Sequence, residues 1–314
     1  MKAWTDRWTN QRWWIYQRER FPLLAHGLLI AVFSASAVSF SRLLRGATDL
    51  PTWPSLLVAG LTSLGIFLQL RIADEFKDFD EDSRYRPYRP VPRGLVQLRE
   101  LGWIGAFTAL LQLGLALWWS ARLVPLLLVT WAYLALMTRE FFVRDWIREQ
   151  PITYLWTHML ILPLTDLYAT ACDWVVAGNT PPTGLGWFIA VSFFNGIGLE
   201  IGRKTRAPGD EEEGVRTYSR LWGRGTAAAA WWGALAVTAG CAVAASAAFN
   251  GQKMTLLILG GLLAIAGLLA ARFVVRPVHA TARWLEHFSG LWTLATYLSL
   301  GAVPWLSRLS RHTP

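Results

Sequence analysis

Residues 74–94 of the chain read DEFKDFDEDSRYRPYRPVPRG and lie between two apolar segments. Asp74, Asp78 and Asp82 recur every four residues, so a helix that continues through this stretch would place all three carboxylates on one face. Carboxylates at this spacing repel each other by roughly 0.2–0.5 kcal/mol per pair in water, and the repulsion grows near a low-dielectric membrane. We therefore expect a compensating cation beside them.

Two kinds of cation could compensate these acids. The arginines that follow could form surface ion pairs with them in a solvated loop: Arg84, Arg86, Arg89 and Arg93. Alternatively, a hard divalent cation such as Mg²⁺ could bind the carboxylate oxygens and be shared with the phosphates of a substrate. The spacing alone leaves both open, although the prolines among the arginines make residues 86–94 a stiff extended turn that is uncommon after a simple acidic loop.

The composition of the rest of the chain predicts an integral membrane protein. Of the 314 residues, 54% are apolar and 16% are charged, whereas soluble domains carry roughly 25% charge. This balance excludes a disordered tail, a disulfide-stapled secreted module and an ordinary cytosolic enzyme. The net charge of +9 is not attributed to nucleic-acid binding, because no polar segment is long enough to form a separate binding module.

Apolar stretches of about 20 residues, the length that crosses a bilayer, predict an all-α fold with nine transmembrane helices in one domain over residues 22–314. The predicted spans are 22–42, 53–73, 100–120, 123–138, 153–172, 184–202, 225–249, 254–272 and 286–306. With this assignment, 24 of the 30 basic residues fall on one side. The positive-inside rule then places the N-terminus in the cytoplasm and the C-terminus on the opposite side.

The first 21 residues contain no apolar core and alternate tryptophan with basic residues: Trp4, Trp8, Trp13 and Trp14. Indole rings among cations are typical of a helix that lies at the level of the lipid headgroups. We therefore expect residues 1–21 to form an interfacial segment on the cytoplasmic surface.

A second polar segment follows the sixth predicted span and reads EIGRKTRAPGDEEEGVRT over residues 200–217. Both polar segments follow even-numbered spans, so both should emerge on the cytoplasmic face. Here acids and cations alternate, and Arg203, Lys204 and Arg206 stand between Glu200 and Asp210.

These two segments resemble the two signatures of the UbiA superfamily of intramembrane prenyltransferases. The first signature reads N-D-x-x-D-x-x-x-D and then R-P-x-R-P-x-P-x-G. Glu75, Asp78 and Asp82 fall on its acids, Asp74 stands where Asn is usual, and residues 86–94 match the turn. The second signature is matched at Glu200, Ile201, Gly209, Asp210, Gly214 and Thr217, with one residue deleted. It departs from the family because Lys204 or Arg206, depending on the alignment, replaces an acid.

The resemblance implies a UbiA-like bundle with a central cavity open to membrane lipid, and a prenyl diphosphate bound through Mg²⁺ between the two segments. The implied metal ligands are Asp74, Glu75, Asp78, Asp82, Glu200 and Asp210, with Asp78, Asp82 and Asp210 as catalytic acids. The implied diphosphate ligands are Arg89, Arg203 and Lys204. Loss of diphosphate from an allylic carbon leaves an anion for metal and cations to stabilise, and a carbocation that aromatic faces can stabilise.

The function expected first is a Mg²⁺-dependent transferase that moves a prenyl group from its diphosphate to an acceptor of unknown identity. A terpene cyclase of the same superfamily is the nearest alternative, because the second segment is altered and tryptophan is abundant. A cation permease is less favoured, since transport sites usually lie near the bilayer midplane. A prenyl-diphosphate binder without turnover also stays open. His158 and Asp166 lie in an apolar run, where an ionisable group often has a function.

Overall fold

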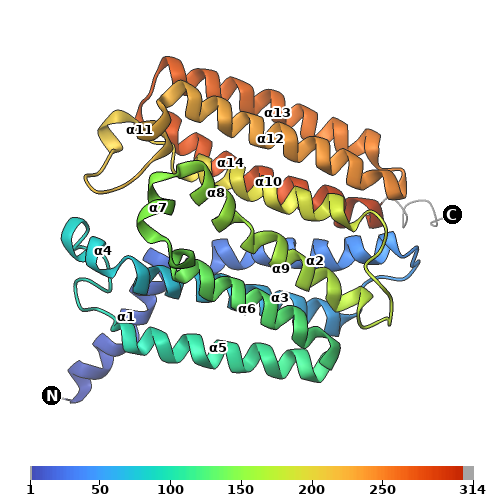
Figure 1. Cartoon of the computed structure of the whole chain (residues 1–314), viewed down its shortest axis with the longest axis horizontal. Helices are drawn as coiled ribbons and strands as arrows, with labels where there is room; N and C mark the ends of the chain where they lie inside the picture. The colour runs from blue at the N-terminus through green and yellow to red at the C-terminus, as the bar shows by residue number, and fades with distance from the viewer. Residues whose placement is uncertain (1, 307–314) are drawn as a thin grey trace.

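The structure is a computed structural model that describes the backbone of residues 2–306 and the side chains of residues 11–306. Within this range the chain is helical and contains no strand (Figure 1). The α-helices are α1 (Lys2–Arg20), α2 (Leu23–Leu44), α3 (Trp53–Lys77), α4 (Phe79–Tyr85), α5 (Leu98–Trp119), α6 (Val124–Thr138), α7 (Arg144–Glu149), α8 (Pro151–Met159), α9 (Ile161–Trp174), α10 (Leu185–Arg203), α11 (Tyr218–Trp222), α12 (Arg224–Ser246), α13 (Gln252–Val275) and α14 (His279–Leu300). Four 3₁₀ turns connect them, η1 (Ala121–Leu123), η2 (Glu140–Phe142), η3 (Pro208–Asp210) and η4 (Ala247–Phe249).

Seven helical segments in the described residues are long and apolar enough to cross a membrane. They are α2, α3, α5, η1 with α6, α10, α12 with η4, and α13, and each coincides with a predicted span. The two other predicted spans differ in form. The span at 153–172 is divided at Leu160 into α8 and α9, so neither part has the required length. The span at 286–306 overlaps α14, which is long enough but more polar, since it carries His279, Arg283, Glu286 and His287.

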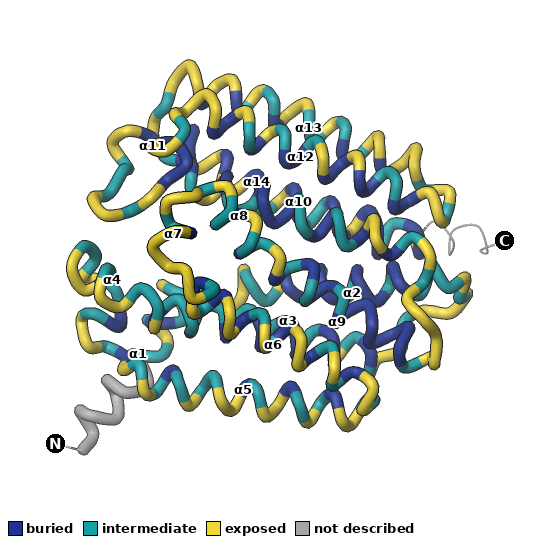
Figure 2. Tube along the Cα trace, in the orientation of Figure 1, coloured by how far each residue is buried: buried dark blue, intermediate teal, exposed yellow. Residues whose placement is uncertain are grey.

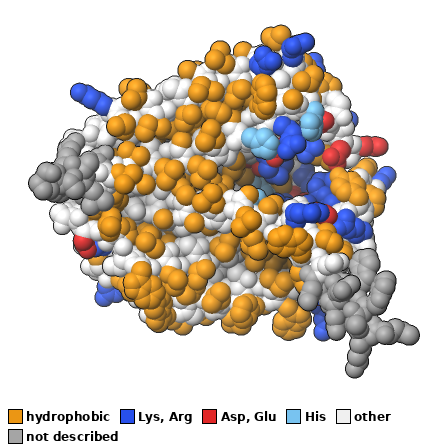
Figure 3. Space-filling view, turned by 180° about the vertical axis from the view of Figure 1, so that it is seen from behind, with side chains coloured by type: hydrophobic (Ala, Val, Ile, Leu, Met, Phe, Trp, Pro, Cys, Tyr) orange, Lys and Arg blue, Asp and Glu red, His pale blue; other side chains and the backbone are white. Residues whose placement is uncertain are grey.

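The long helices run side by side, with α5 on one flank and α12 with α13 on the other (Figure 1). Buried residues concentrate on α2, α3, α9, α10, α12 and α14, whereas α5 and α13 are largely exposed (Figure 2). Large side chains fill the centre, including the fully buried Phe40, Tyr168, Phe188, Trp231 and Trp292. Seen from behind, apolar side chains cover most of the surface (Figure 3), as a bundle surrounded by lipid requires.

The short polar elements gather at one end of this bundle. There α4, α7 and α11 lie close to the ends of α3 and α10 (Figure 1), and the space-filling view shows basic, acidic and histidine side chains concentrated at the same end (Figure 3). The C-terminal half of α1 joins them, because Arg12 pairs with Glu100 at 2.7 Å and Arg93 pairs with Glu19 at 3.0 Å. The bundle therefore brings both sequence segments to one polar surface.

Candidate functional site

The first polar segment is almost a direct continuation of α3. α3 ends at Lys77 and α4 begins at Phe79, with Asp78 as the single non-helical residue between them. Two helical hydrogen bonds bridge this break, since the Asp78 amide donates to the Asp74 carbonyl at 2.9 Å and the Asp82 amide to the Asp78 carbonyl at 2.8 Å. Asp74, Asp78 and Asp82 thus remain one turn apart, as the sequence spacing predicts.

Asp82 is held by the arginines of the proline-rich turn. Its carboxylate is 2% exposed, with Arg89 Nη1 at 2.5 Å and Arg86 Nη2 at 2.9 Å. Of the two cations considered for these acids, arginine or a divalent metal ion, arginine is the one that pairs with Asp82 in the structure. The guanidinium of Arg89 folds back onto α4 through this ion pair, and its role as a diphosphate ligand stays a prediction of the sequence. This pairing closes residues 86–94 over the end of the helix.

Glu75 is bound to the N-terminal helix. Its carboxylate is 2% exposed and accepts a hydrogen bond from Arg20 Nε at 2.5 Å. Because a buried carboxylate is stable only with a cation or hydrogen-bond donors, Arg20 fixes both this side chain and the end of α1. Glu75 thus faces α1.

Among the acids of the first segment that are at least half-buried, Asp74 and Asp78 have the weakest pairing; Asp80 is exposed to solvent. The Asp74 carboxylate has cations only at 3.6 Å (Arg71) and 3.9 Å (Lys77). In the described part of the chain, no ion pair or side-chain hydrogen bond forms on the Asp78 carboxylate. Burial raises the pKa of Asp78 above its ordinary value, and the Asp74 carboxylate adds to this while Lys77 opposes it. The pair therefore presents negative charge that the protein leaves incompletely neutralised.

Glu200, Asp210 and Glu211 of the second segment have partners within that segment or on α14. Glu200 Oε2 accepts from Arg203 at 2.7 Å and Glu200 Oε1 lies 2.8 Å from Lys204 Nζ. Asp210 Oδ1 lies 2.9 Å from His279 Nδ1 on α14. Glu211 accepts hydrogen bonds from the hydroxyls of Thr217 and Ser219, at 2.7 and 2.8 Å. This second segment thus offers cations more readily than free carboxylates.

The two segments meet through Tyr154 on α8. Lys77 Nζ, at the end of α3, donates to the Tyr154 hydroxyl at 3.0 Å. Lys204 Nζ, just after α10, lies 5.9 Å from the centre of the same ring. Asp74 is also close enough to Arg203 to interact with it electrostatically. Lys77 and Lys204 therefore meet at the Tyr154 ring, and Arg203 lies within electrostatic range of Asp74.

The surface loops of the two segments also touch. The Tyr88 hydroxyl donates to Glu212 Oε2 at 3.0 Å. Gly214 has φ +73° and lies so close to the Tyr85 ring that an added Cβ would be 2.5 Å from it. Such a positive φ is easy only for glycine. The loop of the second segment is therefore shaped to pack on α4, and both segments form one face.

Sequence reasoning missed Glu140 at this site. Its carboxylate is 1% exposed and lies 3.6 Å from Lys77 Nζ and 3.4 Å from Arg148 Nε. Glu140, Phe141 and Phe142 all have positive φ, between 47° and 61°, a conformation that is unfavourable for these residue types. Strain of this kind persists where surrounding contacts impose it. The sequence did contain a signal that could have identified Glu140, because it is an acid that follows the span at 123–138 and lies in a loop with several arginines.

Sequence reasoning also missed Tyr154, and it named His158 only as an ionisable group in an apolar run. The two rings stack at 3.8 Å with an interplanar angle of 14°, and His158 Nδ1 lies 2.8 Å from the Tyr154 carbonyl oxygen. A proton on Nδ1 makes this contact a hydrogen bond and leaves Nε2 as an acceptor; Nε2 is buried without a partner in the described part of the chain. Asp166 lies elsewhere, in the core, where it accepts from Tyr297 Oη at 2.7 Å.

The first segment fits one Mg²⁺ ion, and the second segment does not fit one in its present arrangement. Mg²⁺ at diphosphate sites commonly uses one or two carboxylates together with substrate phosphates, and Asp74 and Asp78 provide two underneutralised carboxylates one turn apart. Glu200 is paired with Arg203 and Lys204, and Asp210 is paired with the His279 imidazole. No group of three or more His, Cys, Asp or Glu among the described residues, in either segment, is arranged to hold a metal, so an ion at Asp74 and Asp78 would need phosphate oxygens or water as its other ligands.

Comparison with known proteins agrees with these features. The sequence model of the UbiA prenyltransferase family matches residues 31–294. A search of curated proteins finds no match.

Three solved structures have a similar fold. A UbiA homologue from Aeropyrum pernix K1, in the apo form, has a TM-score of 0.65 and 15% identity over 88% of this chain and 96% of that one. A UbiA homologue from Archaeoglobus fulgidus bound to DMAPP and Mg²⁺ has a TM-score of 0.56 and 15% identity, over 92% and 99%. A digeranylgeranylglyceryl phosphate synthase has a TM-score of 0.55 and 14% identity, over the same shares. At 14–15% sequence identity, these similarities show a shared fold and nothing more specific.

Proposed function

Because this chain belongs to the UbiA prenyltransferase family, we propose that it is a Mg²⁺-dependent intramembrane prenyltransferase that ionises a polyprenyl diphosphate and transfers the prenyl group to an acceptor. One observation carries the proposal: two poorly neutralised acids, Asp74 and Asp78, lie beside a group of cations contributed by both polar segments. A site with this charge pattern suits an anion that arrives with a divalent metal. The Archaeoglobus homologue with its bound DMAPP and Mg²⁺ supports the same pairing of ligand and metal.

We assign the diphosphate to the space between the ends of α3 and α10. Lys204 and Arg203 project from one side and Lys77 from the other, with Tyr154 between them. When the allylic C–O bond breaks, its electron pair leaves with the diphosphate. Cations fixed in advance stabilise this growing charge better than mobile water does. Glu200 keeps Arg203 and Lys204 in position by pairing with both.

We assign the metal to Asp74 and Asp78. A bound Mg²⁺ would supply Lewis-acid stabilisation of the leaving diphosphate. Asp82, paired with two arginines, and Glu75, paired with Arg20, hold the surrounding loop and α1 in place. Glu200 and Asp210 as metal ligands stay predictions of the sequence, because Glu200 would first have to release Lys204 and Asp210 would have to release the His279 ring.

The proposal includes the topology that the basic residues predict. α8 with α9 and α14 would complete nine spans, with the N-terminus and the site on the cytoplasmic side and α1 at the membrane surface. A central cavity for the prenyl chain stays a prediction of the sequence, because buried aromatic side chains occupy the centre of the bundle in this structure. Trp14 is 62% exposed on α1, as a residue that contacts headgroups would be. Single cysteines in place of Arg84 and Lys253 test this orientation, since both native cysteines are buried. An impermeant maleimide should label position 253 in intact cells and position 84 only in inverted vesicles.

The enzymatic proposal is tested with purified protein in nanodiscs. Farnesyl or geranylgeranyl diphosphate is added with Mg²⁺ and a lipid extract as the source of acceptor, and released diphosphate and lipid products are measured. We expect Mg²⁺-dependent transfer that Asp78→Asn abolishes and that Asp49→Asn, an acid-to-amide control on an exposed carboxylate paired with Arg42 at the other end of α2, leaves unchanged. Absence of diphosphate release with every substrate and extract would overturn the proposal.

A terpene cyclase is the second candidate, and the core aromatic residues favour it. Phe40 and Phe188 stack at 4.6 Å, and Phe188 also packs edge-on against Tyr297 at 5.8 Å. Aromatic faces can stabilise a carbocation that attacks its own double bonds. Incubation without any acceptor separates the two functions, because a cyclase forms hydrocarbon products and a transferase does not.

A further inference from the structure

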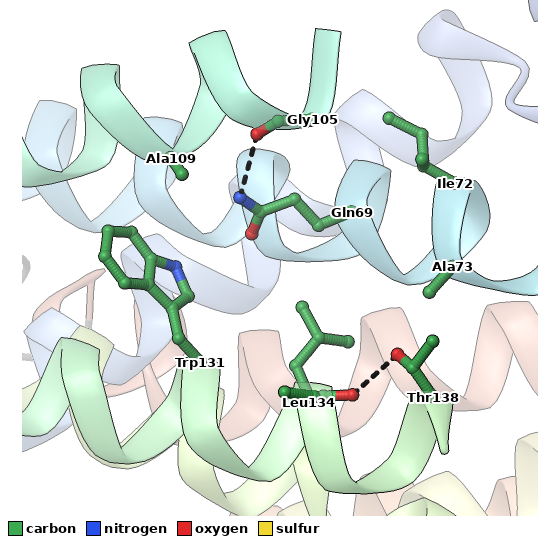
Figure 4. A pocket seen from close by; sticks show the side chains of 9 residues that line it. Gln69, Ile72, Ala73, Gly105, Ala109, Trp131, Leu134 and Thr138 are labelled. Carbon is green, nitrogen blue, oxygen red and sulfur yellow. Dashed lines mark hydrogen bonds between the residues drawn. The ribbon is translucent and has the colours of Figure 1, made fainter. Parts of the chain in front are cut away.

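A pocket of about 270 Å³ lies between α3, α5 and α6, away from the face of α3 that carries Asp74. Nine residues line it: Gln69, Ile72, Ala73, Gly105, Ala109, Trp131, Leu134, Ala135 and Thr138 (Figure 4). Small residues on all three helices make the room. Exposed apolar side chains of α5 flank it, with Trp103, Phe107 and Leu110 each more than two-thirds exposed. The pocket is therefore a groove on the side of the bundle that faces lipid.

The groove contains one hydrogen-bond acceptor without a donor in the described part of the chain. Gln69 is 8% exposed; its Nε2 donates to the Gly105 carbonyl at 3.4 Å, and its Oε1 is buried with no hydrogen-bond partner. Figure 4 shows this oxygen pointing into the space above Trp131 and Leu134. Exchanging the amide oxygen and nitrogen would place the oxygen against the Gly105 carbonyl, where two acceptors repel, so the hydrogen bond fixes the orientation.

The other polar groups of the lining are already used. The Thr138 hydroxyl donates to the Leu134 carbonyl at 2.7 Å, and Trp131 Nε1 donates to Gln112 Oε1 at 3.0 Å. A ligand of this groove must therefore be apolar along its length and must bring a single hydrogen-bond donor to Gln69. A polar acceptor that is buried without a donor inside a membrane is unfavourable, so such a ligand gains affinity from satisfying it.

We propose that this groove is a binding site for a long-chain alcohol, whose hydroxyl donates to Gln69 Oε1 and whose hydrocarbon chain lies against Ala73, Ala109 and Ala135. The site is separate from the diphosphate space and does not depend on the proposed reaction. Lys77 follows Ala73 by one helical turn, and Glu140 follows Thr138 by two residues. One end of the groove therefore approaches the Lys77–Glu140 pair, so the occupant lies next to the polar site without entering it.

Two photoreactive probes test the proposal: hexadecanol and hexadecane, each with a diazirine at the same mid-chain carbon, added to the full-length protein in nanodiscs. We expect the alcohol to label α5 and α6 around Ala109 and Ala135 about five- to tenfold more than the alkane, the factor that one hydrogen bond typically supplies. Gln69→Leu, which keeps the volume, should lower alcohol labelling to the alkane level. Ala109→Phe should block both probes, and Ala106→Phe, on the exposed side of the same helix, should block neither.

Thermal unfolding of each variant, followed by circular dichroism, verifies that the bundle is intact before labelling is compared. Equal labelling by both probes would overturn the proposal, because lipid chains that merely surround the protein would label it without regard to the hydroxyl. Unchanged alcohol labelling in the folded Gln69→Leu variant would overturn it as well, as would labelling confined to other helices.

Discussion

The two polar segments differ in how their acidic side chains are paired with cations. In the first, Asp82 and Glu75 are neutralised by arginines, while Asp78 has no cation partner among the described residues and Asp74 has only distant ones. In the second, Glu200 carries two cations and Asp210 carries a histidine. The first segment is thus suited to attract a metal and the second to contact an anion directly. Family signatures with acids on both sides do not describe this asymmetry.

The largest effect should come from removing the free acid of the first segment. Asp78→Asn keeps the shape of the side chain and removes its charge, so we expect turnover to fall by about a thousandfold, as for loss of a group that stabilises transition-state charge. Diphosphate release at saturating substrate measures it. Turnover within tenfold of the parent protein would remove the metal role from Asp78.

The same variant makes a prediction about stability and pH. Burial raises the pKa of Asp78 above its ordinary value of 3.8, so the folded state holds this proton more tightly than the unfolded state. The free energy of unfolding should therefore decrease as the pH rises from about 3.8 through the raised pKa. Without metal, the Asp78→Asn variant should lose less stability over that range than the parent protein. A steeper loss in the variant, measured by thermal unfolding in EDTA, would contradict the assigned sign.

A smaller but still large effect is expected from the cations of the second segment. Lys204→Gln removes one charge facing the diphosphate space, and we expect turnover to fall by about a hundredfold, mainly through weaker stabilisation of the leaving group. Glu200→Gln releases both cations without removing them, so it should cost about tenfold or less. If Glu200→Gln were as damaging as Asp78→Asn, and raised the Mg²⁺ concentration needed for activity, the second segment would be a metal site after all.

Glu140 should have an intermediate effect on activity, because it acts through Lys77. Glu140→Gln removes the carboxylate that lies 3.6 Å from Lys77 and 3.4 Å from Arg148, and leaves Lys77 less well positioned against Tyr154. We expect about a tenfold loss of turnover, with a larger change in the KM for the prenyl diphosphate than in the amount of folded protein. Glu81→Gln is the matched control, since Glu81 shares Arg148 with Glu140 but forms its other ion pair with Arg144 rather than with Lys77.

The sequence predicted the first segment well because its geometry is local. Spacing of four residues, with hydrogen bonds from the Asp78 amide to Asp74 and from the Asp82 amide to Asp78, suffices to keep these three residues in register. Seven of the nine predicted spans could be predicted for the same reason, since length and hydropathy are properties of a single segment. The break at Leu160 was not predicted, although Pro163 marks it, because a proline has no N–H and its ring clashes with the carbonyl four residues earlier, that of Met159. The break separates α8, which carries Tyr154, from α9 in the core.

The sequence could not predict which residue pairs with each charged side chain. Arg20 lies 55 residues from Glu75, and His279 lies 69 residues from Asp210, so their pairing depends on how the helices pack. The same is true of Glu140 and Tyr154, which lie at this site because α6 and α8 end beside α3. Residue types alone identified the chemistry available, but tertiary packing decides which acids stay free.

A substitution where the two segments touch should lower the free energy of unfolding without lowering turnover. Gly214→Ala introduces a Cβ 2.5 Å from the Tyr85 ring at a φ of +73°, so the loop must move, at a cost of roughly 1–3 kcal/mol. Thermal unfolding measures the loss, and Gly209→Ala is the control because nothing lies within 4 Å of its added Cβ. An unchanged unfolding temperature would mean that the loops do not need this contact to stay together.

The smallest effect should come from the hydroxyl that links the loops at the surface. Tyr88→Phe removes the hydrogen bond to Glu212 at 3.0 Å but keeps the ring, and Tyr88 is 59% exposed, so water can replace the lost donor. We expect the free energy of unfolding to fall by about 0.5 kcal/mol and turnover to stay within about twofold. A large loss of turnover would show that the position of the second loop controls the cations around the diphosphate, and that the two segments work as one unit.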